Sequence, residues 1–137
     1  MSLPPKDPDH WLYRLTPQEW LLAATHELVA ASRALDDREQ RRGVAYARRA
    51  AGMALNAVLV LRADDAWGRS YMDHLRAVAG LASAPDEVRS AARELVEAPL
   101  DGPNLIRIGG ASDQGIAAAT KTLIEWSEDE VAALGRA

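Results

Sequence analysis

The chain has 137 residues, of which 48% are hydrophobic and 26% are charged, and its formal net charge is −4. This length and composition fit one folded domain and exclude an intrinsically disordered chain, while the negative charge gives no reason to expect DNA binding. The absence of cysteine excludes disulfide bonds, thiolate metal sites and cysteine nucleophiles.

Residues 1–15 are expected to form an extended arm that precedes a helical domain at residues 16–137. The first ten residues hold three prolines and lack the hydrophobic core of a secretory signal. No apolar run in the chain reaches the roughly 18 residues that a membrane-spanning helix needs. We therefore expect a cytoplasmic protein that does not enter a membrane.

The first two helices are predicted from apolar periodicity and from their start signals. Thr16 opens a Thr-Pro-Gln-Glu sequence, which supplies a capping box and a proline at the first helical position. Apolar residues follow at steps of three and four as far as Leu35. A second helix is predicted at about residues 37–61. Gly43 and Gly52 interrupt its good helical pattern, which suggests close approach of a neighbouring backbone.

Three further helices follow a short exit loop at residues 62–66. Ser70 opens a second capping box, and Pro85 lies at the start of an acidic first turn. Residues 99–110 are rich in proline and glycine and cannot be helical throughout. The final helix is expected at residues 112–134. The chain thus predicts an all-α fold, an up-and-down bundle of four to five helices.

The second helix carries an aromatic residue, two arginines, alanines and a leucine-rich tail, and the next helix carries a histidine followed by a leucine. These positions are Tyr46, Arg48, Arg49, Ala50, Ala51, Ala54, Leu55, residues 58–61, His74 and Leu75. The pattern resembles the HEPN domain family (higher eukaryotes and prokaryotes nucleotide-binding), over most of residues 16–134. One departure is that Asp73 precedes the histidine, whereas the family's aspartate follows it.

The resemblance implies a helical bundle that is commonly a homodimer and is often paired with a small nucleotidyltransferase. Some branches of the family are ribonuclease toxins with an Arg-x(4–6)-His motif. Other branches lack that motif and serve as binding or partner modules. We expect this chain to belong with the second group, as a non-catalytic module that binds a nucleotide or a partner protein.

Arg69 and His74 formally match the nuclease motif, so a toxin-type, metal-independent RNA endonuclease is an alternative. A histidine can act as general acid or base near neutral pH, and an arginine can stabilise charge on phosphorus. In the nuclease branches, however, the motif lies later in the chain, and residues 108–116 hold no histidine here. The competing interpretation is structural, with His74 bonding locally and Arg69 pairing with Asp73 or a phosphate.

A polar stripe on the second helix could line a groove against the third helix. Arginine would hold a phosphate there and an aromatic ring would stack on a base, which suits a nucleotide or an RNA end. The same residues could instead form a dimer interface, or a hydrogen bond between helices from the asparagine. The candidate ligand-binding residues are Arg48, Arg49, Asn56, Trp67 and Tyr71.

Two tryptophans, Trp11 and Trp67, are expected outside the first core layer and are candidate dimer contacts. The three histidines do not have the spacing of metal ligands, so we expect neither a metal nor another cofactor. A third interpretation of the chain is a purely structural helical bundle.

Overall fold

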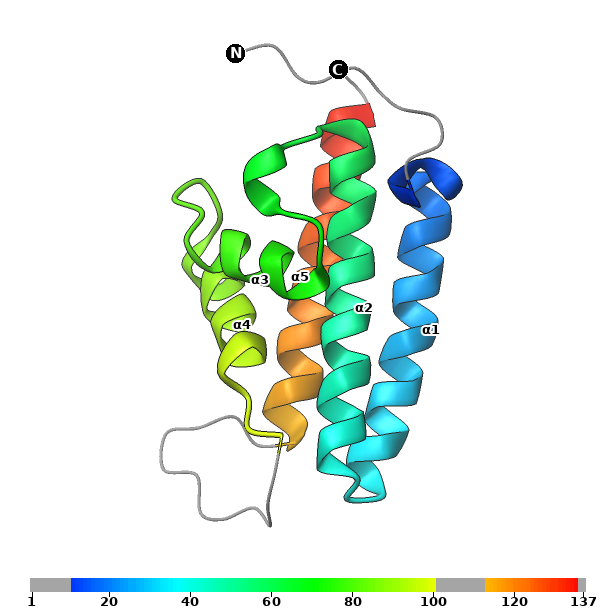
Figure 1. The fold of residues 1–137 in the computed structure, drawn as a ribbon, viewed down its shortest axis with the longest axis vertical. Coiled ribbons are helices and arrows are strands. Elements are labelled where there is room, and N and C mark those ends of the chain that lie inside the picture. Colours follow the sequence, from blue (N-terminus) through cyan, green and yellow to red (C-terminus); the bar gives the residue numbers. More distant parts are fainter. Residues whose placement is uncertain (1–10, 101–112, 136–137) are drawn as a thin grey trace.

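The computed structural model describes residues 11–100 and 113–135, and these form an all-α fold (Figure 1). The predicted fold class and the five α-helices are confirmed. In chain order the elements are a 3-10 helix η1 (Trp11–Arg14), α1 (Pro17–Asp36), α2 (Gln40–Leu61), a 3-10 helix η2 (Asp65–Trp67), α3 (Tyr71–Ala79), α4 (Asp86–Glu97) and α5 (Asp113–Gly135).

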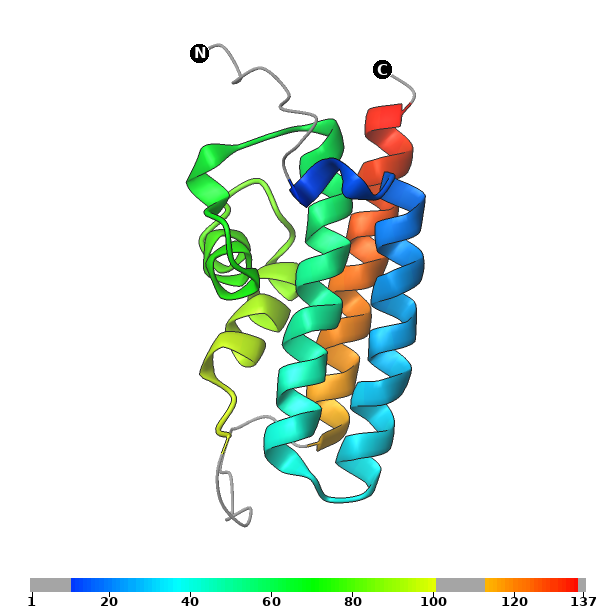
Figure 2. The same cartoon turned by 45° about the vertical axis from the view of Figure 1, so that its right-hand side comes forward.

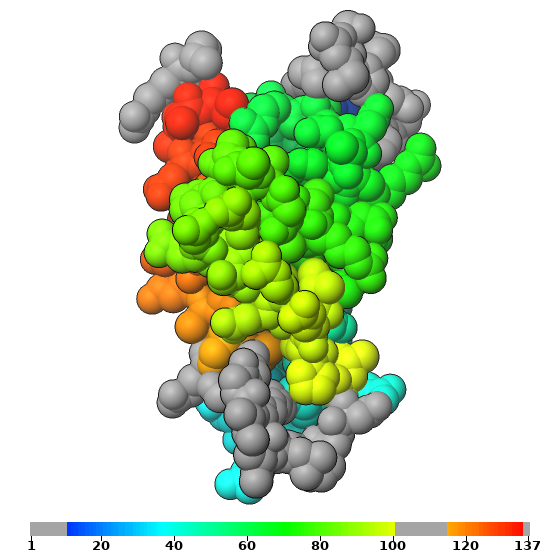
Figure 3. All heavy atoms as spheres, turned by 90° about the vertical axis from the view of Figure 1, so that its left-hand side faces the viewer, coloured from blue at the N-terminus to red at the C-terminus, as the bar shows by residue number. Residues whose placement is uncertain are grey.

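The helices α1, α2, α4 and α5 alternate in direction, and the short α3 crosses between α2 and α4. Figure 2 looks nearly along α3 while the three long helices stand upright. The central helix is α2, which packs against α1, α3 and α5, and α5 also packs against α1 and α4. The side of the molecule in Figure 3 is formed mainly by α3 and α4, with α5 along one edge.

Both predicted capping boxes are present. The Thr16 hydroxyl accepts from the backbone N–H of Glu19 at 3.1 Å, and the Glu19 carboxylate accepts from the N–H of Thr16 at 2.9 Å. At the start of α3, the Ser70 hydroxyl accepts from the N–H of Asp73 at 3.0 Å, and the Asp73 carboxylate accepts in return. These short-range bonds satisfy N–H groups that a helix start leaves without partners.

The buried residues of α2 lie on all its sides, because other helices surround it. It is also the one helix among the described residues that is long and apolar enough to cross a membrane. However, 61% of its apolar window is buried inside the bundle, as in the core helix of a water-soluble protein.

Both glycines of α2 lie where a side chain would collide with a neighbour. A Cβ on Gly43 would meet the side chain and the backbone nitrogen of Leu35. A Cβ on Gly52 would meet the Tyr71 side chain, so there the close neighbour is an aromatic ring of α3 and not a backbone. The absence of a side chain at Gly52 therefore allows α3 to pack directly against α2.

Three sequence expectations need correction at element boundaries. Residues 11–14 are not extended but form η1, whose Leu12 is buried and accepts a hydrogen bond from the Trp20 indole at 2.9 Å. The second helix begins at Gln40 and not at Asp37, because Arg38 has a φ of 61° and leaves the helical region. The predicted exit loop contains the start of η2. Residues 1–10 and the 101–112 part of the Pro/Gly-rich segment lie outside the described residues.

Candidate functional site

The two residues of the possible nuclease motif lie in different environments. His74 is fully buried, and its Nδ1 atom lies 2.8 Å from the carbonyl oxygen of Trp67. Arg69 is exposed and lies before the cap of α3, where its backbone N–H donates to the Asp73 carboxylate at 3.4 Å. The Asp73 carboxylate itself pairs with Arg76 at 3.6 Å. The prediction that His74 bonds locally is thus confirmed. Arg69 contacts Asp73 through its backbone N–H.

Burial keeps the His74 ring neutral. It lowers the pKa of His74 below the usual value, more than the Trp67 carbonyl bond and the nearby Asp73 charge raise it. A carbonyl oxygen only accepts hydrogen bonds, so the ring proton lies on Nδ1 and Nε2 presents a lone pair. That Nε2 atom is buried and has no hydrogen-bond partner among the described residues.

Aromatic residues gather around His74. The Trp11 ring lies nearly parallel to the imidazole at a centroid distance of 6.4 Å, and the Tyr71 ring meets it edge-on, also at 6.4 Å. Trp11 in turn meets Trp20 edge-on at 6.3 Å. The chain has four tryptophans, three tyrosines and no phenylalanine. Three of its seven aromatic residues therefore belong to this aromatic cluster, which we define as Trp11, Trp20 and Tyr71 around His74.

The expectation that Trp67 lies outside the core is wrong. The η2 turn directs its indole into the bundle, where only 3% of the residue is exposed, among the main core residues. Its side chain is therefore not available as a stacking surface or a dimer contact. Trp11 is partly exposed, and its ring packs against the core.

Asn56 is also fully buried, one helical turn after Gly52. Residues four apart share a face of a helix, so Asn56 lies on the face of α2 that meets α3. Neither its amide oxygen nor its amide nitrogen has a partner among the described residues. The alternative of a hydrogen bond from Asn56 to another helix is therefore not seen among the described residues. No signal in the sequence separates this asparagine from an ordinary exposed one.

The Arg48 side chain binds the C-terminal end of α4, so it does not line an open groove between α2 and α3. Its guanidinium donates to the carbonyl oxygens of Leu95, Val96 and Ala98 at 2.8, 3.1 and 3.2 Å. A cation at this end of a helix satisfies carbonyls that have no partner within the helix. Burial, together with the charge of Arg76, lowers the pKa of Arg48.

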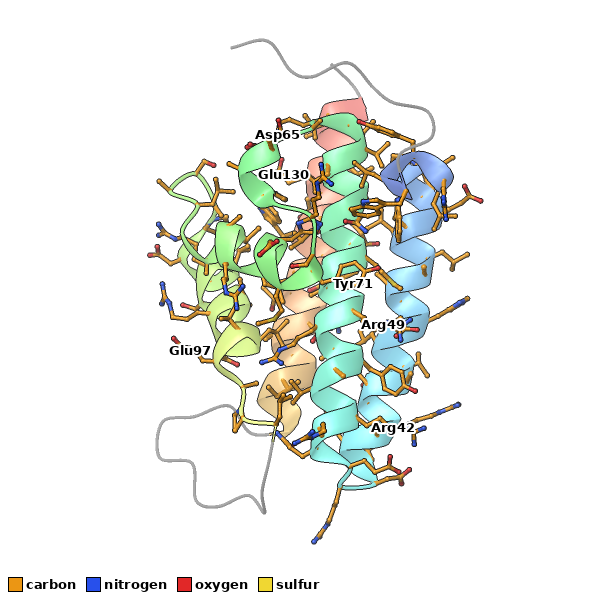
Figure 4. All side chains as sticks on the ribbon, in the orientation of Figure 1. Arg42, Arg49, Asp65, Tyr71, Glu97 and Glu130 are labelled. Atoms are coloured by element: carbon orange, nitrogen blue, oxygen red, sulfur yellow. The ribbon has the colours of Figure 1, made fainter. Side chains whose placement is uncertain are left out.

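Arg49 and Tyr71 lie close together over the front of α2 (Figure 4). The Arg49 guanidinium lies 3.6 Å from the Glu27 carboxylate of α1, with half of the Arg49 side chain exposed. Burial raises the pKa of Tyr71, and the Arg49 charge opposes this. Of the five predicted ligand-binding residues, these two are therefore adjacent at the surface, Asn56 and Trp67 are buried, and Arg48 faces α4.

Within the described ranges, no group of three or more histidine, aspartate or glutamate side chains could hold a metal ion. No protein-family model matches the chain, and no curated protein or solved structure is significantly similar to it. The HEPN resemblance therefore stays a prediction from the sequence pattern.

Proposed function

We propose that this chain is a non-catalytic, HEPN-like helical module of the cytoplasm that binds a nucleotide or a partner protein. The enclosure of His74 carries the proposal. A general acid or base must reach the proton that it transfers, but His74 is fully buried and its Nδ1 is engaged by Trp67. Arg69 is exposed to solvent whereas His74 is not, so a phosphate bound by Arg69 in solution would face a buried imidazole.

Binding is also better supported than a purely structural role. A core that serves only stability normally leaves few buried polar atoms without partners. Here the Asn56 amide and His74 Nε2 are buried without partners among the described residues, and aromatic rings surround His74.

The test is incubation of the purified protein with single-stranded RNA, beside His74→Ala and Arg69→Ala variants. We expect no cleavage above the buffer background by any of the three proteins. Cleavage by the original protein that both substitutions abolish would replace the proposal with the toxin-type endonuclease.

One exposed face of α1 suggests that the protein partner is a second copy of this chain. We define the α1 stripe as Glu19, Leu22, His26, Val29 and Arg33, which follow one another at steps of three and four along α1 and are all exposed. Leu22 is 58% exposed and Val29 is 47% exposed, and they are two of the three exposed large hydrophobic residues in the described ranges. This spacing is that of a helix-pairing seam.

The α1 stripe is complementary to itself. If two copies cross with their α1 helices antiparallel and a two-fold axis near His26, Leu22 of one copy lies beside Val29 of the other. Glu19 then lies near Arg33 of the other copy, so each end of the contact joins opposite charges. A homodimer through α1 is therefore proposed, and a small nucleotidyltransferase remains a partner that only the family resemblance suggests.

Light scattering coupled to gel filtration tests this dimer. We expect the mass of two chains for the original protein, one chain for a Leu22→Lys/Val29→Lys variant, and two chains for the control Leu61→Lys, since Leu61 is exposed on α2. A Glu19→Arg variant should weaken the dimer, and adding Arg33→Glu should restore it. A monomeric original protein, or a dimer that survives the double lysine substitution, contradicts the α1 interface.

A further inference from the structure

Two buried side chains, one on α2 and one on α3, have polar atoms that make no hydrogen bond to the described residues. Asn56 and His74 are both fully buried, and three of their polar atoms have no partner among the described residues: Asn56 Oδ1, Asn56 Nδ2 and His74 Nε2. Each unmatched buried polar atom lowers the stability of the fold. A fold that keeps three such atoms buried therefore gains if a bound polar molecule satisfies them.

The position of Asn56 on α2 places it on the helix face that meets Tyr71 of α3. Gly52, one turn earlier, meets the Tyr71 ring, and Arg49 on the same face reaches Glu27 of α1. Asn56 thus lies on the face that is covered by α3 and by the end of the bundle where α1 begins. Trp11, just before α1, stacks over His74 at that end.

The chemistry of these atoms is selective. An amide side chain offers a donor and an acceptor side by side, which pairs with an amino group next to a ring nitrogen, as asparagine does with adenine. His74 Nε2 adds an acceptor for a further N–H. Trp11 and Tyr71 supply flat apolar surfaces, on which a planar heterocycle stacks.

We propose that Asn56 and His74 form a covered site for a nucleobase, closed by Trp11. This inference deepens the binding function proposed above by naming its site and its ligand class. The base pairs with the Asn56 amide, donates an N–H to His74 Nε2, and stacks against the aromatic cluster.

Access to the site requires η1 to move. This cover is a four-residue 3-10 helix, fastened by the buried Leu12 and by the bond from the Trp20 indole to the Leu12 carbonyl. Short elements with few buried contacts open at low free-energy cost. In this proposal, outward movement of Trp11 removes the ring that stacks on His74 and opens the site.

Calorimetric titration with adenine tests the site, with N6,N6-dimethyladenine as the matched probe that lacks the amino donors. We expect adenine to bind and the dimethyl compound to bind at least about tenfold more weakly, the loss that one asparagine–adenine pair represents. The proposal is overturned if adenine at millimolar concentration gives no heat of binding, or if the two compounds bind equally. In that case water molecules satisfy the buried polar atoms.

Two substitutions locate the binding. Asn56→Leu should weaken adenine binding at least about tenfold. Thr120→Val is the control, because Thr120 is equally buried but its hydroxyl already donates to the Ile116 carbonyl at 2.8 Å. If Asn56→Leu does not fold by circular dichroism, Asn56→Thr replaces it. Unchanged binding by the Asn56 variant contradicts the site, whereas RNA cleavage by the original protein would contradict only the non-catalytic function.

Discussion

The His74 Nδ1 atom lies 2.8 Å from the Trp67 carbonyl oxygen and ties the first turn of α3 to η2 across seven residues. This one bond has two consequences. It fixes which ring nitrogen carries the proton, and it holds the imidazole in the core of the ligand-free protein. His74, which looks most like a catalytic residue in the sequence, thus holds α3 and η2 together.

The burial of neutral His74 predicts that acid destabilises the fold. The folded-state pKa of His74 lies below the unfolded value of about 6.5, so the unfolded chain binds more protons between those two values. Stability is therefore complete above about pH 6.5 and falls on acidification towards the folded-state pKa, by at most about 1.4 kcal/mol per pH unit. Urea unfolding at a series of pH values measures this.

His74→Phe is the control for that titration, because it keeps a ring in the core and removes the ionisable group. Its stability should change less between pH 7.5 and pH 5 than that of the original protein. Asp73, the neighbouring charged group, has its pKa lowered by hydrogen bonds from Ser70, so its effect appears at lower pH. An equal pH dependence in both proteins would exclude His74 as the cause.

Gly52→Ala should destabilise the protein although alanine is the better helix former. The added methyl group would overlap the Tyr71 side chain, and overpacking of this kind costs typically about 1–3 kcal/mol. A Gly52→Ala/Tyr71→Ala variant should lose less stability than the two single losses added together. Gly80→Ala is the matched control, since its nearest neighbours lie 3.9 Å away and its φ is −104°. Thermal unfolding of the four variants measures the difference.

Arg48→Met should cost more stability than Arg49→Met. Arg48 donates to three carbonyl oxygens at the end of α4, and its removal leaves them without that donor, at about 1–3 kcal/mol. Arg49 makes one half-exposed ion pair with Glu27, which is worth about 0–1 kcal/mol. Denaturant midpoints compare the two variants, and an equal loss would contradict the assigned role of Arg48.

Asn56→Leu should leave the ligand-free protein as stable as the original or more stable. The leucine fills a similar volume and removes two buried polar atoms that have no partner in the described part of the chain. Asn56→Ala is the comparison, since it removes the same atoms but leaves a cavity, which lowers stability. A large loss in the leucine variant, measured by thermal unfolding, would show that the amide is already satisfied in the ligand-free protein.

The local elements of this fold could be read from the sequence because their causes are local. The Thr16 and Ser70 capping boxes each join residues three apart, and both helix starts appear as predicted. Gly52 was also informative, since a glycine inside a good helix pattern indicates a close neighbour. The start of α2 differs from the prediction because nothing about an arginine residue indicates the left-handed backbone that Arg38 adopts.

The candidate site could be predicted only in part, because its members are far apart in the chain. Arg48, Arg49 and Asn56 share one helix, and periodicity suggested a common polar stripe. The structure gives each a different neighbour: α4 for Arg48, Glu27 for Arg49, and the interior for Asn56. The prediction for Trp67 is wrong for the same reason, since only the η2 turn decides that its indole enters the core.

The sequence by itself determined that the chain is all-α and where most of its helices begin. Capping, periodicity and helix propensity act over three or four residues, and they need no knowledge of distant neighbours. Only the tertiary structure decided that His74 is sealed from solvent, because burial depends on how η1, η2 and α3 pack against α2. The Arg69-x4-His74 pattern is therefore visible in the sequence alone. Tertiary packing decides that His74 is buried while Arg69 stays exposed.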